Sequence, residues 1–374
     1  MRLTTDGSLR TRLLVAASLG ALALGAAACG SSSKSSTSSS SSSSSGSGTT
    51  NGAGSTFAAP VYQQWGSTLK GQGLTVNYNA VGSGAGVTQL QAATVGFAGD
   101  DAPLKSSEVQ GMKGPVLQFP VAFGSITVSY NLSGVKSGIK LDGPTLGNIY
   151  LGKIKSWNDP AIKALNPGLS LPSTAITVVH RSDSSGTTDG FTKFLTAVSP
   201  TWASQVGHGK DVKWPTGTGA AKNAGVAAAV KQTPGAIGYV EQAYALENGF
   251  TYAAVKNKAG SYVLPTLSNT SAAAVGVKVP ADLGISTINS SNPQAYPIAS
   301  QTFIDVYTDP CKSGGLGSST ASGLKKFLTY AFGPGQQTLG SGSGQIPYAP
   351  LPSSLESKDT AQLAKLVCNG SPVS

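Results

Sequence analysis

The sequence predicts an α/β fold in which most neighbouring strands pair in parallel. Runs of β-branched residues, such as 175–179, alternate with segments whose apolar residues recur at helical spacing, such as 191–198. Strands and helices that alternate in this way form sheets covered by helices. The length of 374 residues allows a sizeable core and two domains.

Each element is expected from its own pattern. The predicted helices are a segment with Val61, Trp65 and Leu69 on one face, 87–93, a segment that begins near Thr187, the alanine-rich 219–232, and 324–331. The predicted strands are 74–78, 97–104, 126–130, 175–179, 236–240 and 302–307. The segment 257–292 has weak periodicity and receives no assignment.

The N-terminus has the features of a secretory signal peptide, which we place at residues 1–28. Three arginines precede an apolar run over 13–24, which is too short for an ordinary transmembrane helix. Small residues then lead to Cys29, a pattern that resembles a bacterial lipobox, although Ala26 stands where leucine is usual. We favour lipidation of Cys29; the alternative is an ordinary signal-peptidase site with an incidental cysteine.

A tether follows the cysteine. Residues 31–45 are all serine except Lys34 and Thr37, so they cannot form a core. We therefore expect residues 29–50 to be a lipidated cysteine and a flexible linker that holds a globular body at a membrane surface.

Composition excludes several classes of function. The net charge is +10, but no lysine/arginine run with interleaved aromatics appears, so nucleic acid is not expected as a partner. His180 and His208 are the only histidines, which leaves little material for a metal site, and no cofactor is expected. Cys311 and Cys368 suggest one disulfide in an exported chain; two buried free cysteines are the alternative.

The stretch 180–188, His-Arg-Ser-Asp-Ser-Ser-Gly-Thr-Thr, joins a predicted strand to a predicted helix. The exposed N–H groups of a helix start attract an anion. Arg181 adds a planar, permanently charged group, and Asp183 is placed to hold it. Ser185 and Thr187 add hydroxyl donors. The stretch favours an oxyanion site, and the alternative is a plain serine/threonine cap beside a surface arginine.

Seven stretches in order resemble the phosphate-binding proteins of bacterial phosphate-specific ABC importers. They are Gly-Ala-Gly-Ser-Thr-Phe at 52–57, Val-Gly-Ser-Gly at 81–84, Asp-Ala-Pro-Leu at 101–104, Leu-Gln-Phe-Pro at 117–120, 146–154, 181–187 and 234–240. The resemblance implies a two-lobed periplasmic-binding-protein fold with the ligand in the cleft between lobes. Lobe 1 would comprise 52–121 and 303–374, and lobe 2 would comprise 122–302.

The resemblance also implies a ligand set and a role. The implied phosphate contacts are Thr56, Phe57, Ser83, Asp101, Arg181, Ser185, Gly186 and Thr187, with Phe57 and Gly186 acting through backbone N–H. Asp100 stands where the family has a small residue, so either acid could face the ligand; the neighbouring Ala102-Pro103 favours Asp101. His180 receives no role.

We therefore expect an extracytoplasmic, lipid-anchored, monomeric receptor that delivers phosphate to an ABC permease and is not an enzyme. One alternative is a secreted phosphatase with Ser185 as nucleophile and His180 as base. A surface adhesin or antigen with a degenerate cleft is a second alternative, and intact Arg181 and Asp101 disfavour it. A binder of another oxyanion, such as sulfate or molybdate, is the closest alternative by fold.

Overall fold

The computed structural model describes residues 48–374. The signal peptide, Cys29 and most of the serine-rich linker lie outside this range. Within it, no helix has both the length and the apolar character needed to cross a membrane.

One mixed sheet organises the molecule. Its strand order is β2-β1-β3-β12-β4-β8-β6-β7, and β9 pairs with β4. The strands are β1 (Gly48–Gly54), β2 (Leu74–Ala80), β3 (Phe97–Asp100), β4 (Val116–Tyr130), β6 (Thr177–Arg181), β7 (Thr218–Ala220), β8 (Ala236–Glu241), β9 (Thr251–Tyr252) and β12 (Ala299–Tyr307). Parallel pairs occur at both ends of the sheet, whereas β4 and β12 pair antiparallel with each other and with their other neighbours.

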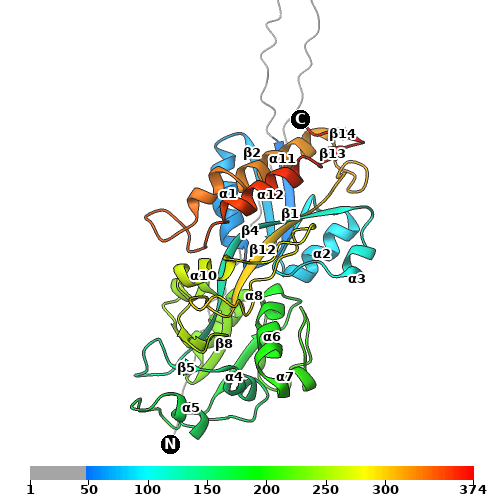
Figure 1. Cartoon of the computed structure of the whole chain (residues 1–374). Helices are drawn as coiled ribbons and strands as arrows, with labels where there is room; N and C mark the ends of the chain where they lie inside the picture. The colour runs from blue at the N-terminus through cyan, green and yellow to red at the C-terminus, as the bar shows by residue number, and fades with distance from the viewer. Residues whose placement is uncertain (1–47) are drawn as a thin grey trace, which may run out of the picture. The chain divides into compact units, whose positions relative to one another are not determined.

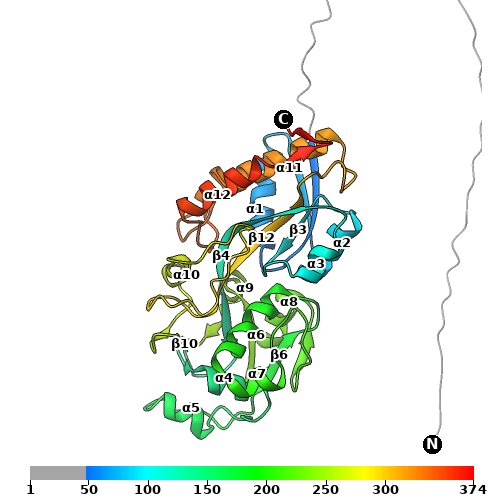
Figure 2. The same cartoon turned by 45° about the vertical axis from the view of Figure 1, so that its right-hand side comes forward.

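The two long strands β4 and β12 run side by side from one half of the body into the other (Figures 1 and 2). All nine residues of β12 are buried. The register between the strands shifts at Thr302/Phe303, opposite Val121, as in a β-bulge. The body has the two-lobed fold expected for the chain, and β4 and β12 belong to both of its halves.

Lobe 1 contains the helices that cover β1, β2 and β3. They are α1 (Ala59–Lys70), α2 (Ser83–Ala92), α3 (Ser106–Gln110), α11 (Ser318–Ala331), the short 3-10 helix η1 (Pro334–Thr338) and α12 (Ser353–Leu363). Val61, Trp65 and Leu69 are buried on α1, as their spacing predicts, and Pro60 lies in its first turn. The predicted face of α11 is buried as well, with Leu324, Phe327, Leu328 and Ala331.

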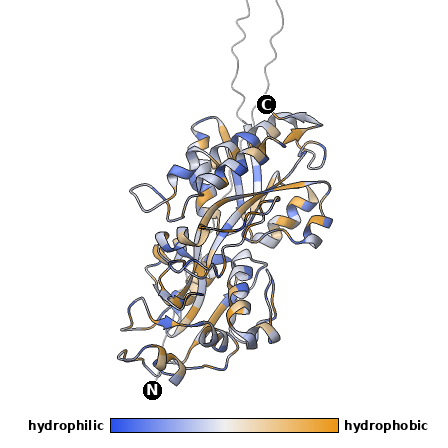
Figure 3. Cartoon of the chain, in the orientation of Figure 1, coloured by the Kyte–Doolittle hydropathy of each residue, from blue (hydrophilic) through white to orange (hydrophobic). Residues whose placement is uncertain are grey.

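Lobe 2 contains the other helices of the described residues. They are α4 (Gly143–Tyr150), α5 (Pro160–Leu165), α6 (Gly186–Val198), α7 (Pro200–Gln205), α8 (Lys222–Gln232), α9 (Gln242–Glu247) and α10 (Leu267–Ala274). A small sheet in the order β11-β10-β5 joins β5 (Lys140–Leu141), β10 (Ala254–Lys256) and β11 (Tyr262–Val263). Hydrophobic residues, orange in Figure 3, occur in both lobes, and one buried cluster includes residues from each.

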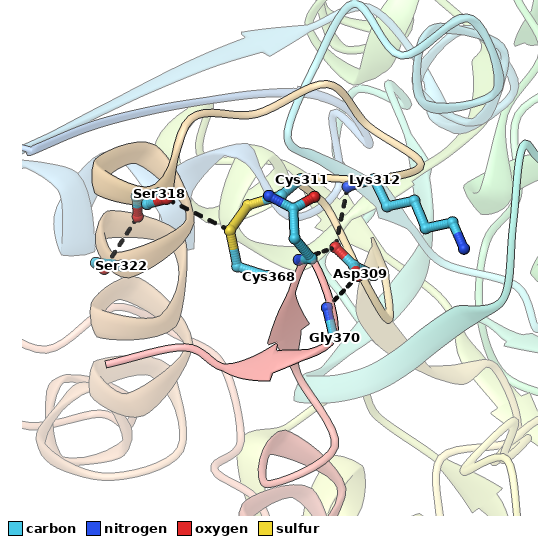
Figure 4. Close-up of a disulfide and its surroundings, with 8 residues drawn as sticks. Asp309, Cys311, Lys312, Ser318, Ser322, Cys368 and Gly370 are labelled. Atoms are coloured by element: carbon cyan, nitrogen blue, oxygen red, sulfur yellow. Dashed lines mark hydrogen bonds between the residues drawn. A yellow bond between two sulfur atoms is a disulfide. The ribbon is translucent and has the colours of Figure 1, made fainter.

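The C-terminal segment is closed by a disulfide between Cys311 and Cys368 (Figure 4). The hairpin of β13 (Val367–Cys368) and β14 (Ser371–Pro372) lies beside it. Asp309 accepts hydrogen bonds from the backbone N–H groups of Lys312, Asn369 and Gly370, at 2.9, 3.0 and 3.0 Å. Of the two states left open for these cysteines, the structure has the disulfide.

Several predicted boundaries are wrong. The linker does not extend to Thr50, because β1 begins at Gly48 and pairs in parallel with β2. The helix expected from 219 begins at Lys222, since 218–220 form β7; the helix expected from 87 begins at Ser83. The unassigned 257–292 contains β11 and α10. These errors fall where glycine and small residues carry little periodicity.

Candidate functional site

Asp101 lies directly after β3 and is 2% exposed. Its Oδ1 accepts hydrogen bonds from Ser55 Oγ at 2.6 Å and Thr302 Oγ1 at 2.8 Å. Its Oδ2 accepts from Ser83 Oγ at 3.3 Å. Burial raises the pKa of Asp101 to about 7, further raised by the Asp100 charge and opposed by the hydrogen bonds and by Arg181. The carboxyl group is therefore held in place and titrates near neutral pH.

Arg181 ends β6 and is 3% exposed. Asp183 holds its guanidinium through two hydrogen bonds, Nε to Oδ1 at 2.7 Å and Nη2 to Oδ2 at 2.5 Å. Burial raises the pKa of Asp183, but its bonds to Arg181 outweigh this and lower it overall. Nη1 is directed to Thr187 Oγ1 at 3.4 Å. The sequence-based expectation that Asp183 orients this arginine is confirmed.

The start of α6 faces Asp101. Ser185 caps the helix, its Oγ accepting from the N–H of Thr188 at 3.2 Å. The N–H groups of Gly186 and Thr187 occupy the first two helical positions, where no carbonyl of the same helix can reach them. A Cβ at Gly186 would lie 2.7 Å from Asp101 Cβ and 2.8 Å from its Oδ2. Only glycine permits this close approach of the helix start to the carboxylate.

Thr56 and Phe57 lie in the turn between β1 and α1, and both are buried. The carbonyl of Thr56 accepts from Tyr244 Oη at 2.8 Å, and that of Phe57 accepts from Tyr348 Oη at 2.6 Å. Thr56 Oγ1 also contacts Asn223 Nδ2 of lobe 2 at 3.0 Å. Hydrogen bonds with Tyr244, Tyr348 and Asn223 therefore hold this turn in place.

Asp100 points away from this constellation and forms a buried ion pair with Lys210 of lobe 2. Lys210 Nζ also contacts Glu108 Oε1 at 2.7 Å. The backbone carbonyl of Lys210 accepts from the N–H of Ser185 at 2.9 Å. Burial raises the pKa of Asp100, and the Lys210 charge opposes the rise. Of the two adjacent acids, Asp101 is the one in contact with Ser83 and Gly186.

His180 is committed elsewhere. Its ring stacks on Trp214 with centroids 4.6 Å apart, and Nδ1 contacts the carbonyl of Arg181 at 3.0 Å. Burial lowers its pKa. Ser185 Oγ accepts its hydrogen bond from the N–H of Thr188 and not from His180. Across residues 48–374, no cluster of three or more histidine, cysteine or acidic side chains could hold a metal ion.

The structure therefore brings all eight expected ligand residues into one connected, buried region. Ser83, Asp101 and Gly186 meet directly, Arg181 meets Thr187, and Asn223 links Thr187 to Thr56. Arg181 donors, the four hydroxyls of Thr56, Ser83, Ser185 and Thr187, and helix-start N–H groups are suited to a small oxyanion, and one carboxylate offers an acceptor to it.

Comparison with known proteins identifies the family. The sequence model of the PBP superfamily domain matches residues 39–334. The Phosphate-binding protein PstS of Haemophilus influenzae is 40% identical over 317 residues, covering 83% of this chain and 91% of that protein. The chain belongs to the PstS family of phosphate-binding proteins.

Another PstS relative supports the same family assignment. The Phosphate-binding protein PstS 3 of Mycobacterium tuberculosis is 38% identical over 301 residues, covering 76% of this chain and 77% of that protein. Among solved structures, the periplasmic phosphate-binding protein PfluDING superposes with a TM-score of 0.65 at 24% identity, covering 83% of this chain and 93% of that one. This likeness establishes the shared fold.

Sequence reasoning missed the residues that support the PstS-like ligand set. Ser55 and Thr302 bind Asp101, Asn223 bridges two threonines, and Lys210 neutralises Asp100. Ser55 lies inside the 52–57 motif, and its place beside Thr56 was an available signal. The other three come from distant segments, and no local pattern marks them.

Proposed function

We propose that this protein binds inorganic phosphate between its lobes and delivers it to an ABC permease from the extracytoplasmic side. The observation that carries the proposal is the buried constellation of Arg181, the start of α6 and Asp101. The PstS relatives, named as phosphate-binding proteins, support the same ligand.

Phosphate has four oxygens, and the site offers donors from both lobes. Arg181, Ser185, Gly186 and Thr187 lie in lobe 2, whereas Thr56, Phe57 and Ser83 lie in lobe 1. Charge-assisted hydrogen bonds from arginine and helix-start N–H groups provide anion affinity. Because donors come from both lobes, the bound ion stabilises their contact.

Asp101 is the proposed selectivity element. An ionised carboxylate only accepts, and monohydrogen phosphate still carries a proton to donate. Fully ionised sulfate has no such proton, so two acceptors would face each other in a buried site. Sites that pair with a ligand donor reject an analogue without it by roughly 10⁴–10⁵-fold.

The remaining expectations are also proposals. They are lipidation of Cys29, anchoring at the outer face of the cell membrane, a monomeric state, and lobe boundaries at 121/122 and 302/303. The register shift opposite Val121 supports those boundaries. Replacement of Cys29 by alanine should move the protein from the membrane fraction to the soluble fraction; continued membrane pelleting would contradict the anchor.

We also propose that the protein is not a phosphatase. Ser185 Oγ accepts one hydrogen bond from the N–H of Thr188, and His180 Nδ1 contacts the carbonyl of Arg181 rather than Ser185. A nucleophilic serine requires a base within hydrogen-bonding reach.

The decisive experiment is an assay for inorganic phosphate released when the purified protein is denatured, followed by titration calorimetry of the phosphate-stripped protein. We expect about one phosphate per chain and saturable binding. A protein that carries no phosphate and gives no heat with it would contradict the function. Hydrolysis of a phosphate ester, lost in Ser185→Ala, would favour the enzyme.

A further inference from the structure

Asn223 is a fully buried asparagine that the ligand set does not include. It is the second residue of α8, in lobe 2. Its side chain reaches two of the threonines assigned to the site, Thr56 from lobe 1 and Thr187 from α6. It is therefore a direct connection between the two lobes at the ligand position.

The orientation of its amide is determined by the backbone. Asn223 Oδ1 accepts a hydrogen bond from the N–H of Glu241 at 3.0 Å. A backbone N–H can only donate, so the oxygen must face Glu241 and the NH₂ group must face the threonines. This removes the ambiguity that otherwise attends an asparagine side chain.

Both threonine hydroxyls receive two donors. Thr56 Oγ1 accepts from the backbone N–H of Asn223 at 3.3 Å and from its Nδ2 at 3.0 Å. Thr187 Oγ1 accepts from Asn223 Nδ2 at 3.3 Å and from Arg181 Nη1 at 3.4 Å. A hydroxyl oxygen has two lone pairs and one proton. With both lone pairs in use, the hydroxyl can act toward a ligand only as a donor.

We propose that Asn223 is a positioning residue that turns the hydroxyls of Thr56 and Thr187 into obligate donors to the bound phosphate. The inference rests on the proposed function and adds a residue that need not touch the anion. Without Asn223, each hydroxyl regains a free lone pair and can rotate its proton away. Because Thr56 lies in lobe 1 and Asn223 in lobe 2, the Thr56 hydroxyl is aligned in this way only when the lobes are in contact.

The test is a double-mutant cycle measured by calorimetric titration with inorganic phosphate. Asn223→Ala in the wild-type background should weaken phosphate binding by about 10–100-fold. The reason is that the Thr56 and Thr187 hydroxyls lose the orientation in which they donate hydrogen bonds to the charged ligand. In a Thr187→Val background, the same substitution should cost at least about threefold less, because part of its action has already been removed. A purely structural role would give the same loss in both backgrounds.

Control variants distinguish a specific loss of phosphate affinity from a general loss of stability. Asn166 is a buried asparagine of lobe 2 that bonds Lys140 and Ile162, away from the site. Asn166→Ala should lower the melting temperature and leave phosphate affinity unchanged. If Asn223→Ala does not fold, Asn223→Leu, which keeps the volume, takes its place in the cycle.

The outcomes distinguish this inference from the proposed function. A wild-type protein that does not bind phosphate overturns the function, and the inference with it. A wild type that binds, together with an Asn223 variant that binds equally well, overturns the inference alone. Equal losses in the two backgrounds overturn it too.

Discussion

At the scale of single residues, two adjacent carboxylates have opposite environments. Asp101 receives three hydroxyl hydrogen bonds and lies against Gly186. Asp100 receives the ammonium of Lys210 and the backbone N–H groups of Asp101 and Ala102, at 2.7 and 3.2 Å. Asp100 is the last residue of β3 and Asp101 lies in the bend that follows, so their side chains meet different partners.

This difference predicts the effect of Asp101→Asn on selectivity. The amide can turn its NH₂ group toward the ligand, so the variant should keep part of its phosphate binding and gain sulfate binding. Titration calorimetry with both anions measures this, and Asp100→Asn is the control that should retain the preference for phosphate. A wild type that binds sulfate nearly as well as phosphate would show that no filter exists.

Asp101 also predicts how stability depends on pH without phosphate. Its folded pKa is about 7, raised from an ordinary value of 3.8 chiefly by burial, so the folded state favours the protonated form. The contribution of this group is fully present below its unfolded pKa and is lost as pH rises toward and through about 7. We expect the stability of wild type relative to Asp101→Asn to fall between about pH 4 and about pH 7.

Urea unfolding of both phosphate-free proteins across this range measures the difference. Asp305 and Asp359 also have raised pKa values through burial, but they are present in both proteins and do not depend on the Asp101 charge, so their contributions cancel. Parallel stability profiles for the two proteins would contradict the assignment of a raised pKa to Asp101.

At the scale of elements, the loop between α7 and β7 is tied to the opposite lobe. Its Lys210 is 4% exposed and contacts both Asp100 at the end of β3 and Glu108 on α3. The same residue accepts the N–H of Ser185 through its carbonyl. Separation of the lobes must break this buried ion pair, so it stabilises the form in which they meet.

Lys210→Met should therefore weaken phosphate binding by about tenfold or more and speed phosphate release. The reason is that Asp100 would be left without its cation when the lobes meet, which is costly for a buried charge. Calorimetry and stopped-flow release measure the two effects. Lys213→Met, an exposed neighbour in the same loop, is the control.

Neutralising both partners refines this prediction. The Asp100→Asn/Lys210→Met double variant should bind more tightly than Lys210→Met alone, because the fully buried position 100 then carries no charge and only the partly exposed Glu108 loses its cation. Unchanged affinity and release rate in Lys210→Met would show that the ion pair does not influence ligand retention.

At the scale of the whole molecule, the folded body begins earlier than composition suggests. Gly48, Thr49 and Thr50 pair with Leu74, Thr75 and Val76 in the parallel ladder of β1 and β2, and Thr50 is fully buried. These residues extend the sheet although they continue a serine- and glycine-rich stretch. The first strand of lobe 1 is therefore partly encoded by residues of linker composition.

Removal of these residues should reduce stability. A protein that begins at Asn51 should melt at a lower temperature than one that begins at Ser45, because three ladder positions and a buried threonine are lost. Differential scanning calorimetry of the two proteins without phosphate is the measurement. Equal melting temperatures would show that residues 48–50 contribute nothing to the folded body.

The sequence alone determined the α/β class and the oxyanion character of 181–187. It also predicted helices α1, α2, α6, α8 and α11 and strands β2, β3, β4, β6, β8 and β12. These follow from local periodicity and from residue types whose chemistry is independent of distant neighbours. Tertiary structure alone showed that Asp100 pairs with Lys210 while Asp101 contacts Ser83 and Gly186, that β4 and β12 run from one lobe into the other, and that Asn223 and Lys210 join the lobes. Such features depend on contacts between segments more than 100 residues apart, as for Lys210 with Asp100 and Asn223 with Thr56, and no local pattern records them.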